Sequence, residues 1–444
     1  MPTNSYNLPN GWSLTTIGTS CDILDNLRRP ISEEKRQNRQ GHVPYYGANG
    51  QQGWIDSPIF NEDLILLAED GGNFDNYANQ PIAYMIHGEA WVNNHAHVLR
   101  AKYLTTNLWV FYNLVHKDIR FYIRGGTRAK LNRGELQTIE IPLPPLFEQK
   151  IIANILDTLD TQIQQTEQLI AKLKQMKIGL LHDLLTKGID GHGDVRDPVA
   201  HPEEFKEESF LQKRIKLPKK WEIQLLKSFL VGIDAGKSPD CPDQPAGAGD
   251  WGILKVSAIH PTGFRAEENK VITNPAYIKP AYEVHDGDLL MSRANTSELV
   301  GIVCLVSKPR PQLLLCDKTL RLQVNPKNAL SEFIFYMLQM PFVRTQIEMH
   351  ATGSSASMKN ISQSSIKNLV ILAPSREEQK EIIAILNAHD ARITAEENEL
   401  AKLKQLKKGL MHDLLTGHVR VTQLMAESGQ LAVRSKSVSD CNCK

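Results

Sequence analysis

Two stretches of nearly the same sequence, KLKQMKIGLLHDLLTKG (172–188) and KLKQLKKGLMHDLLTGH (402–418), decide how this chain folds. The likeness extends back to Glu148 and Glu378, and about 22 of the 39 aligned positions are identical without a gap. Chance does not produce such a match, so the chain contains an internal repeat, and its architecture has to be understood from that repeat.

Both copies are predicted to form long helices. They lack proline and are rich in Leu, Lys, Gln, Glu and Ala, which favour helix. Apolar residues recur at spacings of three and four, as in a coiled-coil strand. They are Leu156, Leu159, Ile163, Ile170, Leu173 and Leu180 in the first copy and Leu386, Ile393, Leu400, Leu403 and Leu410 in the second.

Polar residues interrupt this apolar seam at four positions, namely Thr166, Lys177, Glu396 and Lys407. A local shift of register would let Met176 and Leu406 replace the two lysines. A helix of 39 residues is about 58 Å long at 1.5 Å per residue, and its apolar stripe must pack against another surface. The nearest candidate is the other copy, in a parallel or an antiparallel pair.

Weaker repeats flank the two helices. LPNGWSLTTIG from Leu8 resembles LPKKWEIQLLK from Leu217, and each opens a block of short predicted strands and turns. The blocks end in matching phrases, AKLNRGELQTIEIPLPPLFEQ (129–149) and MKNISQSSIKNLVILAPSREEQ (358–379). The predicted fold is therefore α+β, with two related domains built on small β-sheets and separated by two long helices, in a pseudo-twofold repeat.

The domain boundaries follow from these repeats. They are 1–145 for the first block, 146–187 for the central helix, 188–215 for a linker, 216–375 for the second block, 376–418 for the distal helix and 419–444 for a tail. Gly, Pro and charged residues in the linker argue against a packed core there, and the tail is expected to fray.

Composition and charge limit the class of protein. The chain has 444 residues, 41% hydrophobic and 23% charged, which is enough for more than one globular domain. It has no apolar run of 18 residues and no signal-peptide pattern at its start, so we expect a cytoplasmic protein. Six cysteines without a C-x-x-C pair predict neither a disulfide framework nor a structural zinc site. The net charge of +1 does not by itself indicate a nucleic-acid binder.

Two short patterns suggest catalysis only superficially. VGIDAGKS (231–238) lacks the first glycine of a phosphate-binding loop, because Val231 stands in its place. Asp240 together with Glu268 and Lys270 fits the loose pattern of metal-dependent nucleases, but so short a pattern often arises by chance.

The repeated HDLLT phrase contains a histidine next to an aspartate, as in an acid–base dyad. The pairs are His182-Asp183 and His412-Asp413. Neighbouring residues of a helix point in different directions, so we expect these side chains not to face one another and the phrase to serve packing or partner contact. No catalytic residue is predicted in this chain.

Polar and aromatic side chains gather in the loops of both blocks. Asn and Gln can pair with adenine, Arg and Lys with guanine, and Ser, Thr and basic side chains with phosphates. The candidate DNA-binding residues are Tyr45, Tyr46, Asn49, Gln51, Asn93, Asn94, His95, Arg128 and Lys130 in the first block and Lys255, Ser257, Arg293, Asn295, Thr296, Ser355 and Lys359 in the second. A carbohydrate-binding surface would use similar side chains.

The combination of these phrases resembles the specificity subunits of type I restriction-modification enzymes, over nearly the whole chain. The resemblance rests on the two block exits, the repeated helix, and the phrases PYYGANGQQGWID (44–56), WVNNHAHVLR (91–100) and DGDLLMSRANTSELVG (286–301). The set is specific to that family, whereas a single phrase is not.

The resemblance implies that each block is a target-recognition domain for one half of a bipartite double-stranded DNA sequence. It also implies that the helices pair antiparallel as a spacer and bind two modification (methyltransferase) subunits, and that restriction (translocase-nuclease) subunits complete the enzyme. Catalysis and the cofactors S-adenosylmethionine, ATP and Mg²⁺ would belong to those partners, with no cofactor in this chain. Two equivalent docking surfaces on one chain would explain the repeat.

Two other classes of function stay open. A non-DNA adaptor would use the coiled coil to present two binding modules to protein or glycan, without the steep salt dependence of a DNA complex. A nuclease acting alone would cleave DNA with magnesium when the chain is purified by itself.

Overall fold

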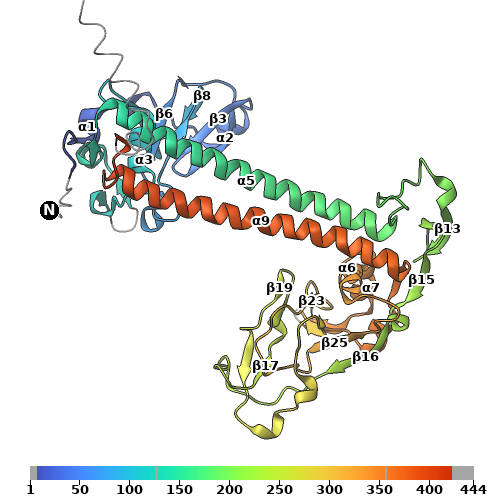
Figure 1. The fold of residues 1–444 in the computed structure, drawn as a ribbon. Helices are drawn as coiled ribbons and strands as arrows, with labels where there is room; N and C mark the ends of the chain where they lie inside the picture. Colours follow the sequence, from blue (N-terminus) through green and yellow to red (C-terminus); the bar gives the residue numbers. More distant parts are fainter. Residues whose placement is uncertain (1–7, 126–128, 356–357, 423–444) are drawn as a thin grey trace, which may run out of the picture. The chain divides into compact units, whose positions relative to one another are not determined.

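The computed structural model describes residues 8–125, 129–355 and 358–422 (Figure 1). The chain forms two compact units: unit 1 contains Met1–Leu169 and Glu396–Lys444, and unit 2 contains Ile170–Ala395. Each unit therefore combines one block with part of both repeated helices. None of the helices in the described ranges combines the length and the hydropathy that a bilayer-spanning segment needs.

Unit 1 contains the first block. Its strands are β1 (Ser13–Thr16), β2 (Cys21–Ile23), β3 (Val43–Gly47), β4 (Gly50–Ile55), β5 (Phe60–Asn61), β6 (Leu64–Ala68), β7 (Ala83–Ile86), β8 (Glu89–Val92), β9 (Ala96–Ala101), β10 (Ile123–Arg124), β11 (Lys130–Leu131) and β12 (Glu140–Leu143). Its helices are α1 (Ile17–Ser20), α2 (Glu33–Gln37), α3 (Asn107–Leu114), α4 (Arg133–Thr138) and the first part of α5 (Leu146–Thr186).

Two four-stranded sheets form the centre of this block, in the orders β2-β9-β6-β7 and β4-β3-β8-β5. Every residue of β6 is buried, as expected for a central strand that is covered on both faces. Helix α3 packs on the first of these sheets and buries Trp109 and Leu114 completely.

Unit 2 contains the second block. Its strands are β13 (Phe205–Phe210), β14 (Lys213–Pro218), β15 (Glu222–Leu225), β16 (Leu230–Ala235), β17 (Gly252–Leu254), β18 (Ile259–His260), β19 (Gly263–Phe264), β20 (Asn269–Val271), β21 (Leu289–Ser292), β22 (Ala294–Asn295), β23 (Val303–Leu305), β24 (Leu313–Leu314), β25 (Thr319–Val324), β26 (Thr352–Ser355), β27 (Met358–Asn360) and β28 (Val370–Ala373). Its helices are α6 (Ser331–Leu338), α7 (Pro341–His350), α8 (Gln363–Lys367) and the first part of α9 (Arg376–Leu415).

The flanking repeat seen in the sequence is also a repeat of structure. In unit 1, β1 pairs antiparallel with β12, so that Leu14 lies opposite Pro142 just before α5 begins. In unit 2, β15 pairs antiparallel with β28, so that Ile223 lies opposite Leu372 just before α9 begins. The central sheet of unit 2 has the order β16-β25-β21-β23, and its strand β21 is fully buried like β6.

Parts of the two long helices lie side by side and antiparallel within each unit. In unit 1, Lys407 of α9 pairs with Asp160 of α5, and Lys404 pairs with Glu167 at 2.7 Å. The residue numbers of these pairs increase along α5, from 160 to 167, while they decrease along α9, from 407 to 404, so the two helices run antiparallel. In unit 2, Lys177 of α5 pairs with Asp390 of α9 in the same way. The antiparallel coiled-coil prediction is confirmed.

The predicted seam is confirmed for most apolar positions but not for the proposed shift of register. Leu156, Leu159, Ile170, Leu173, Leu386 and Ile393 are buried. Met176 and Leu406 are 52% and 50% exposed, so they do not replace the lysines. The side chains of Lys177 and Lys407 are only 28% and 16% exposed. An aspartate on the partner helix neutralises each lysine, which is why a cation is tolerated on the seam.

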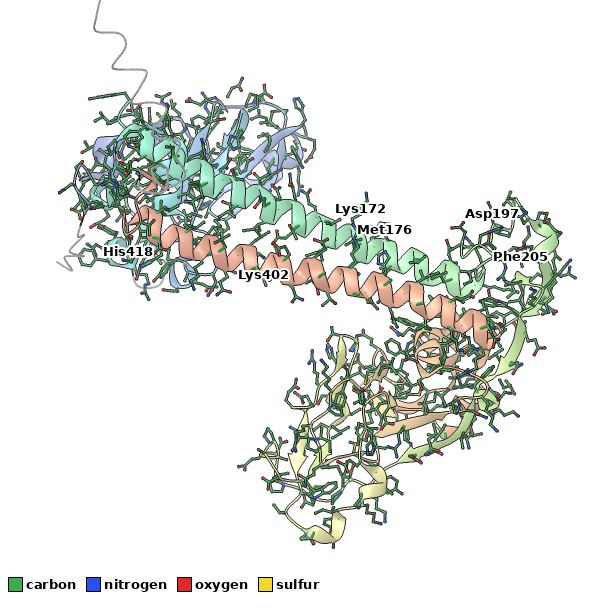
Figure 2. All side chains as sticks on the ribbon, viewed as in Figure 1. Lys172, Met176, Asp197, Phe205, Lys402 and His418 are labelled. Atoms are coloured by element: carbon green, nitrogen blue, oxygen red, sulfur yellow. The ribbon has the colours of Figure 1, made fainter. Side chains whose placement is uncertain are left out.

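The segment predicted to be a linker is partly folded, which corrects the sequence interpretation. Strands β13 and β14 form a hairpin, Ile189 and Phe210 belong to the core of unit 2, and Phe205 is also buried. Figure 2 labels Phe205 and Asp197 in this region. Gly188 has a φ of +68°, so it terminates α5 as a left-handed cap rather than starting a flexible connection.

The beginning of the predicted tail is also packed. Helix α9 ends at Leu415, Gly417 has a φ of +73°, and Val421 is 1% exposed in the core of unit 1. The prediction of a frayed tail is therefore wrong for residues 419–422. Its remainder, residues 423–444, lies outside the described residues.

Candidate nucleic-acid interface

In each block, the residue that follows a buried strand has both its N–H and its carbonyl bonded to other segments, and the predicted site residues lie next to it. In unit 1, Glu69 follows the buried strand β6. Its N–H donates to the carbonyl of His95 at 2.8 Å, and its own carbonyl accepts from the N–H of Leu131 at 2.7 Å. These two hydrogen bonds join the end of β6 to the segments around His95 and Leu131, which carry several of the candidate residues.

In unit 2, Arg293 follows the buried strand β21 with the same two contacts. Its N–H donates to the carbonyl of Lys318 at 2.8 Å, and its carbonyl accepts from the N–H of Ile361 at 3.0 Å. Glu69 and Arg293 are therefore equivalent positions of one scaffold, although their charges are opposite.

Around Glu69 the side chains form a compact charged cluster. Arg28 Nη1 lies 2.5 Å from Glu69 Oε2, Lys130 Nζ lies 2.9 Å from Glu69 Oε1, and His97 Nδ1 lies 2.7 Å from Asp25 Oδ2. Burial alone would raise the pKa of Asp25, but the hydrogen bond and charge of His97 hold that pKa below its usual value.

Three members of this cluster have the spacing of metal ligands. Atoms of Asp25, Glu69 and His97 lie within 4.8 Å of one another, and oxygen and nitrogen donors suit several divalent metals. Arg28 and Lys130 already supply positive charge to Glu69, so the cluster is a satisfied ion-pair network that supports the neighbouring loops.

The loop from Asn93 to His95 divides into a structural and an accessible part. Asn93 is 4% exposed; its Oδ1 accepts from the N–H of His95 at 2.8 Å, and its Nδ2 donates to Gln52 at 3.3 Å. Both ends of its amide are occupied, so its prediction as a base contact is corrected to a role in shaping the loop. Asn94 is exposed, and His95 is partly exposed with Nδ1 2.5 Å from Asp70.

The two predicted tyrosines are part of the scaffold. Tyr45 is 3% exposed, donates its hydroxyl to the carbonyl of Ile31 at 3.4 Å, and has the guanidinium of Arg36 4.6 Å from its ring centre. Its prediction as a DNA contact is therefore corrected. Tyr46 is half-buried against Tyr84, and burial raises the pKa of its hydroxyl.

The remaining candidates of unit 1 gather near Asp70. Asn49 is exposed and donates to the carbonyl of Gly71 at 2.9 Å, and Lys130 lies opposite Asp70 in an isolated bridge. Gln51 is exposed on β4. The structure thus brings Asn49, Asn94, His95 and Lys130 to one place, whereas Arg128 lies outside the described residues.

In unit 2 the three-stranded sheet β22-β27-β26 brings several candidates together next to Arg293. Asn295 lies opposite Lys359 in this sheet, and Ser355 belongs to β26. The side chain of Asn295 accepts from the N–H of Thr296 at 2.9 Å, and Lys359 donates to a main-chain carbonyl at 2.8 Å. Thr296 is exposed.

Lys255 and Ser257 form a separate patch with acidic partners. Lys255 Nζ lies 2.8 Å from Asp243, and the hydroxyl of Ser257 donates to Glu268 at 2.6 Å. Lys270 also pairs with Asp243, at 3.6 Å. Glu268 and Lys270 therefore have partners other than those that the nuclease pattern requires.

The other short patterns are accounted for by secondary structure. The start of VGIDAGKS lies in strand β16, not in a loop that opens a helix. His182 Nδ1 lies 3.3 Å from Asp183 Oδ1, so the expectation that these neighbours do not face one another is wrong. Their side chains are 62% and 39% exposed, and the contact is an ordinary surface pair.

Each unit contains a buried cluster, which we call the latch, that was not predicted from the sequence. In unit 2, Glu378 of α9 accepts from the indole N–H of Trp221 at 2.9 Å and from the N–H of Ile189 at 3.1 Å, and it pairs with Arg196 at 2.5 Å. Trp221 is fully buried.

In unit 1, the latch is formed by Glu148 of α5, which accepts from the indole N–H of Trp12 at 3.3 Å and pairs with Arg420 at 2.5 Å. The tryptophans belong to the repeated L-P-x-x-W phrases and the glutamates to the repeated E-Q start of the helices. These two repeats were the signal that could have predicted the latch.

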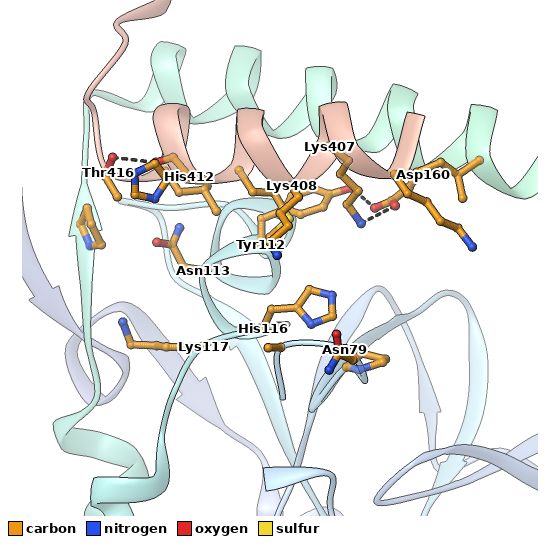
Figure 3. Close-up of a pocket in the computed structure, with 17 residues that line it drawn as sticks. Asn79, Tyr112, Asn113, His116, Lys117, Asp160, Lys407, Lys408, His412 and Thr416 are labelled. Carbon is orange, nitrogen blue, oxygen red and sulfur yellow. Dashed lines mark hydrogen bonds and ion pairs between the residues drawn. The ribbon is translucent and has the colours of Figure 1, made fainter. Parts of the chain in front are cut away.

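A second repeated cluster lines a cavity of about 720 Å³ in unit 1, next to α3 (Figure 3). The hydroxyl of Tyr112 donates to Asp160 at 2.9 Å, and Asp160 pairs with Lys407. Burial, together with the charge of Asp160, raises the pKa of Tyr112. Lys404, Lys408 and His412 also line the cavity, so its polar wall is mainly basic.

Unit 2 repeats this cluster of a tyrosine, an aspartate and a lysine. Tyr336 donates to Asp390 at 2.8 Å, and Lys177 pairs with the same aspartate at 2.5 Å. Both clusters join a block to the paired helices of its own unit.

Residues 9–175 and 259–405 match the family described as "Type I restriction modification DNA specificity domain". The matched ranges contain more than half of the chain. The chain belongs to this family.

Curated members of this specificity family are similar to the chain over different lengths. The chain is 33% identical over 176 residues to "Type I restriction enzyme EcoEI specificity subunit" of Escherichia coli, which covers 39% of the chain and 30% of that protein. This match therefore spans about a third of the relative. The chain is 24% identical over 443 residues to "Type I restriction enzyme MjaVIII specificity subunit" of Methanocaldococcus jannaschii, covering 94% and 95% of the two chains.

A solved member of the type I family shares the fold. The S subunit of the type I restriction-modification system from M. genitalium has a TM-score of 0.58 and 14% sequence identity, and the match covers 94% of this chain and 98% of that chain. The resemblance inferred from the sequence and the predicted α+β fold class are both confirmed.

Proposed function

We propose that this chain is the DNA-specificity subunit of a type I restriction-modification complex. The observation that carries the proposal is the repeated scaffold, in which Glu69 and Arg293 occupy equivalent main-chain positions but are surrounded by unlike polar side chains. Two related modules with different surfaces suit a bipartite and asymmetric DNA target.

Each block acts as a target-recognition domain, with boundaries near residues 1–145 and 216–375. In the first domain the accessible candidates are Asn49, Gln51, Asn94, His95 and Lys130. In the second domain the candidates are Arg293, Asn295, Thr296 and Lys359, together with Ser355 as a residue of β26, and Lys255 and Ser257 form a second patch. Amide, hydroxyl and basic side chains provide the donors and acceptors for base edges and phosphates.

The paired helices act as the spacer and as the docking surface for two modification subunits. Helix α5 has 41 residues and helix α9 has 40. These nearly equal lengths support a long spacer made of the two paired helices. Exposed cations such as Lys402, 77% exposed and labelled in Figure 2, lie on the repeated docking phrase. Restriction subunits complete the assembly in the cytoplasm.

Chemistry belongs to the partner subunits in this proposal. S-adenosylmethionine, ATP and Mg²⁺ bind there, and this chain supplies recognition without catalysis. The ion-paired state of Asp25, Glu69 and His97 agrees with a structural role for the main acidic cluster.

The test is to co-express the chain with its cognate modification subunit in a methylation-free host and to map methylated adenines by single-molecule sequencing. Two short half-sites around a fixed unread gap are expected. A stable complex without methylation, together with salt-insensitive binding of the purified complex to duplex DNA, would contradict the proposal in favour of the adaptor function, because counterion release makes DNA binding steeply salt-dependent.

A further inference from the structure

Arg293 differs from the other basic candidates of unit 2 because its side chain has no hydrogen bond or ion pair with any residue that the structure describes. Lys255 is paired with Asp243, and Lys359 donates to a main-chain carbonyl. Arg293 is partly exposed, and its guanidinium is left without a partner among the described residues.

The main chain of Arg293 is held on both sides. Its N–H and its carbonyl are bonded to Lys318 and Ile361, and the preceding strand β21 is fully buried. Next to it, Asn295 and Lys359 face each other across the β22–β27 pair. A guanidinium on a rigid strand end loses less conformational freedom on binding than one on a flexible loop, which favours selective contact with one base.

The equivalent position of unit 1 cannot make such a contact. Glu69 is 8% exposed, and Arg28 and Lys130 neutralise its carboxylate. At this equivalent position the second domain therefore has the guanidinium of Arg293, with five N–H donors and no partner among the described residues, whereas the first domain has Glu69 in an ion-pair network.

We propose that Arg293 reads a guanine in the major groove, so that the half-site of the second domain contains a G·C pair that Arg293 determines. Guanine offers O6 and N7 as two adjacent acceptors, and the bidentate arginine contact is the commonest specific contact of this kind. The exposed neighbours Thr296 and Lys318 are available for phosphates. The inference rests on the proposed function and adds to it the residue and the base.

The experiment compares methylation motifs of the complex of this chain with its modification subunit, for the wild type, Arg293→Ala, Arg293→Lys and Arg214→Ala. Arg214 is a matched control, because its side chain is 85% exposed on the β14 hairpin strand. For Arg293→Ala we expect one guanine of the second half-site to become degenerate, with a loss of discrimination of roughly 5- to 150-fold in competition binding and no change in the first half-site.

Arg293→Lys separates base reading from phosphate binding. Lysine keeps the charge but loses the bidentate fork, so discrimination at that guanine should also fall. An unchanged motif with uniformly weaker binding in Arg293→Ala, or an Arg293→Lys complex that equals the wild type, would overturn the proposal and assign Arg293 to phosphate. An unchanged motif with unchanged binding would overturn it as well. A wild-type complex that yields no bipartite motif would instead refute the proposed function.

Discussion

Removing the carboxylate of the unit 2 latch by Glu378→Ala should destabilise unit 2 strongly. The side chains of Glu378 and Arg196 are only 9% and 11% exposed, so the charge that remains on Arg196 is largely buried. Trp221 loses the acceptor of its indole N–H in a fully buried place, and Ile189 loses the acceptor of its main-chain N–H.

The size of the effect follows from these contacts. Breaking a buried ion pair by removing one partner costs about 3–5 kcal/mol. Each orphaned neutral donor adds about 1–3 kcal/mol if it stays dry, but such terms are not additive. Arg196 retains Glu204 at 3.3 Å and the carbonyl of Lys187 at 3.2 Å, which limits the loss. We therefore expect a loss of about 3–5 kcal/mol, and a smaller loss for Glu378→Gln, which keeps one acceptor oxygen.

Hydrogen exchange read by mass spectrometry suits this test, because a chain of two units need not unfold in a single transition. Exchange should accelerate in peptides from residues 187–196 and from β15, and not in the first block. Glu148→Ala should shift the effect to unit 1, around residues 416–422.

The matched control is Glu207→Ala, which removes the exposed pair with Arg214. These side chains are 65% and 85% exposed, so the loss should be under about 1 kcal/mol. If Glu378→Ala changed exchange and urea unfolding no more than Glu207→Ala does, the latch would not stabilise unit 2 and the reasoning would be refuted.

Three further outcomes are expected. Insertion of four residues next to Thr166 lengthens α5 by about 6 Å. The unread gap of the methylation motif should therefore grow by one or two base pairs of about 3.4 Å each, with both half-sites unchanged. An unaltered gap would contradict the spacer role. Asn94→Ala should alter only the half-site of the first domain, whereas Asn93→Ala should lower stability by about 1–3 kcal/mol, measured by urea unfolding, because His95 loses its N–H acceptor. The pKa of Asp25 is lowered in the folded protein, so the ionised carboxylate stabilises the fold fully above the ordinary aspartate pKa of about 3.9. This stabilisation is lost as the pH falls through the pKa of the folded state, so Asp25→Asn should make the acid unfolding of unit 1 less steep in that pH range. An unchanged acid-unfolding profile would show that the cluster does not contribute.

Much of the fold could be predicted because the deciding signals are local and repeated. Helix propensity and the apolar stripe depend only on neighbours in the sequence, so α5 and α9 were predicted to within a few residues of their observed ends. The fate of the linker could not be predicted in this way. Its hairpin is stabilised by burying Phe210 in a core supplied by distant residues, and this tertiary packing overrides the local signals of Gly and Pro.

The candidate site was harder to predict, because residue type does not reveal whether a polar atom is already bonded. Asn93 and Asn94 are adjacent and chemically identical, yet one is buried with both amide atoms occupied and the other is exposed. An aromatic residue in a polar loop suggests a DNA contact at Tyr45, but the alternation of side chains along β3 directs Tyr45 into the core. Which side chain of a pair faces solvent follows from strand register, which the sequence indicates only weakly here.

The latches also bear on why the helical repeat stays so similar while the blocks diverge. Arg196 follows the first copy of the helix but completes the latch of Glu378, at the start of the second copy. Arg420 follows the second copy but completes the latch of Glu148, at the start of the first. The end of each copy must therefore fit the start of the other, and a change that suits only one copy leaves a buried charge unpaired, at a cost of several kcal/mol. In the described part of the chain, the contacts of Glu69 and of Arg293 each lie within their own block, so the loops that follow can change independently, which agrees with the proposed reading of two unlike half-sites.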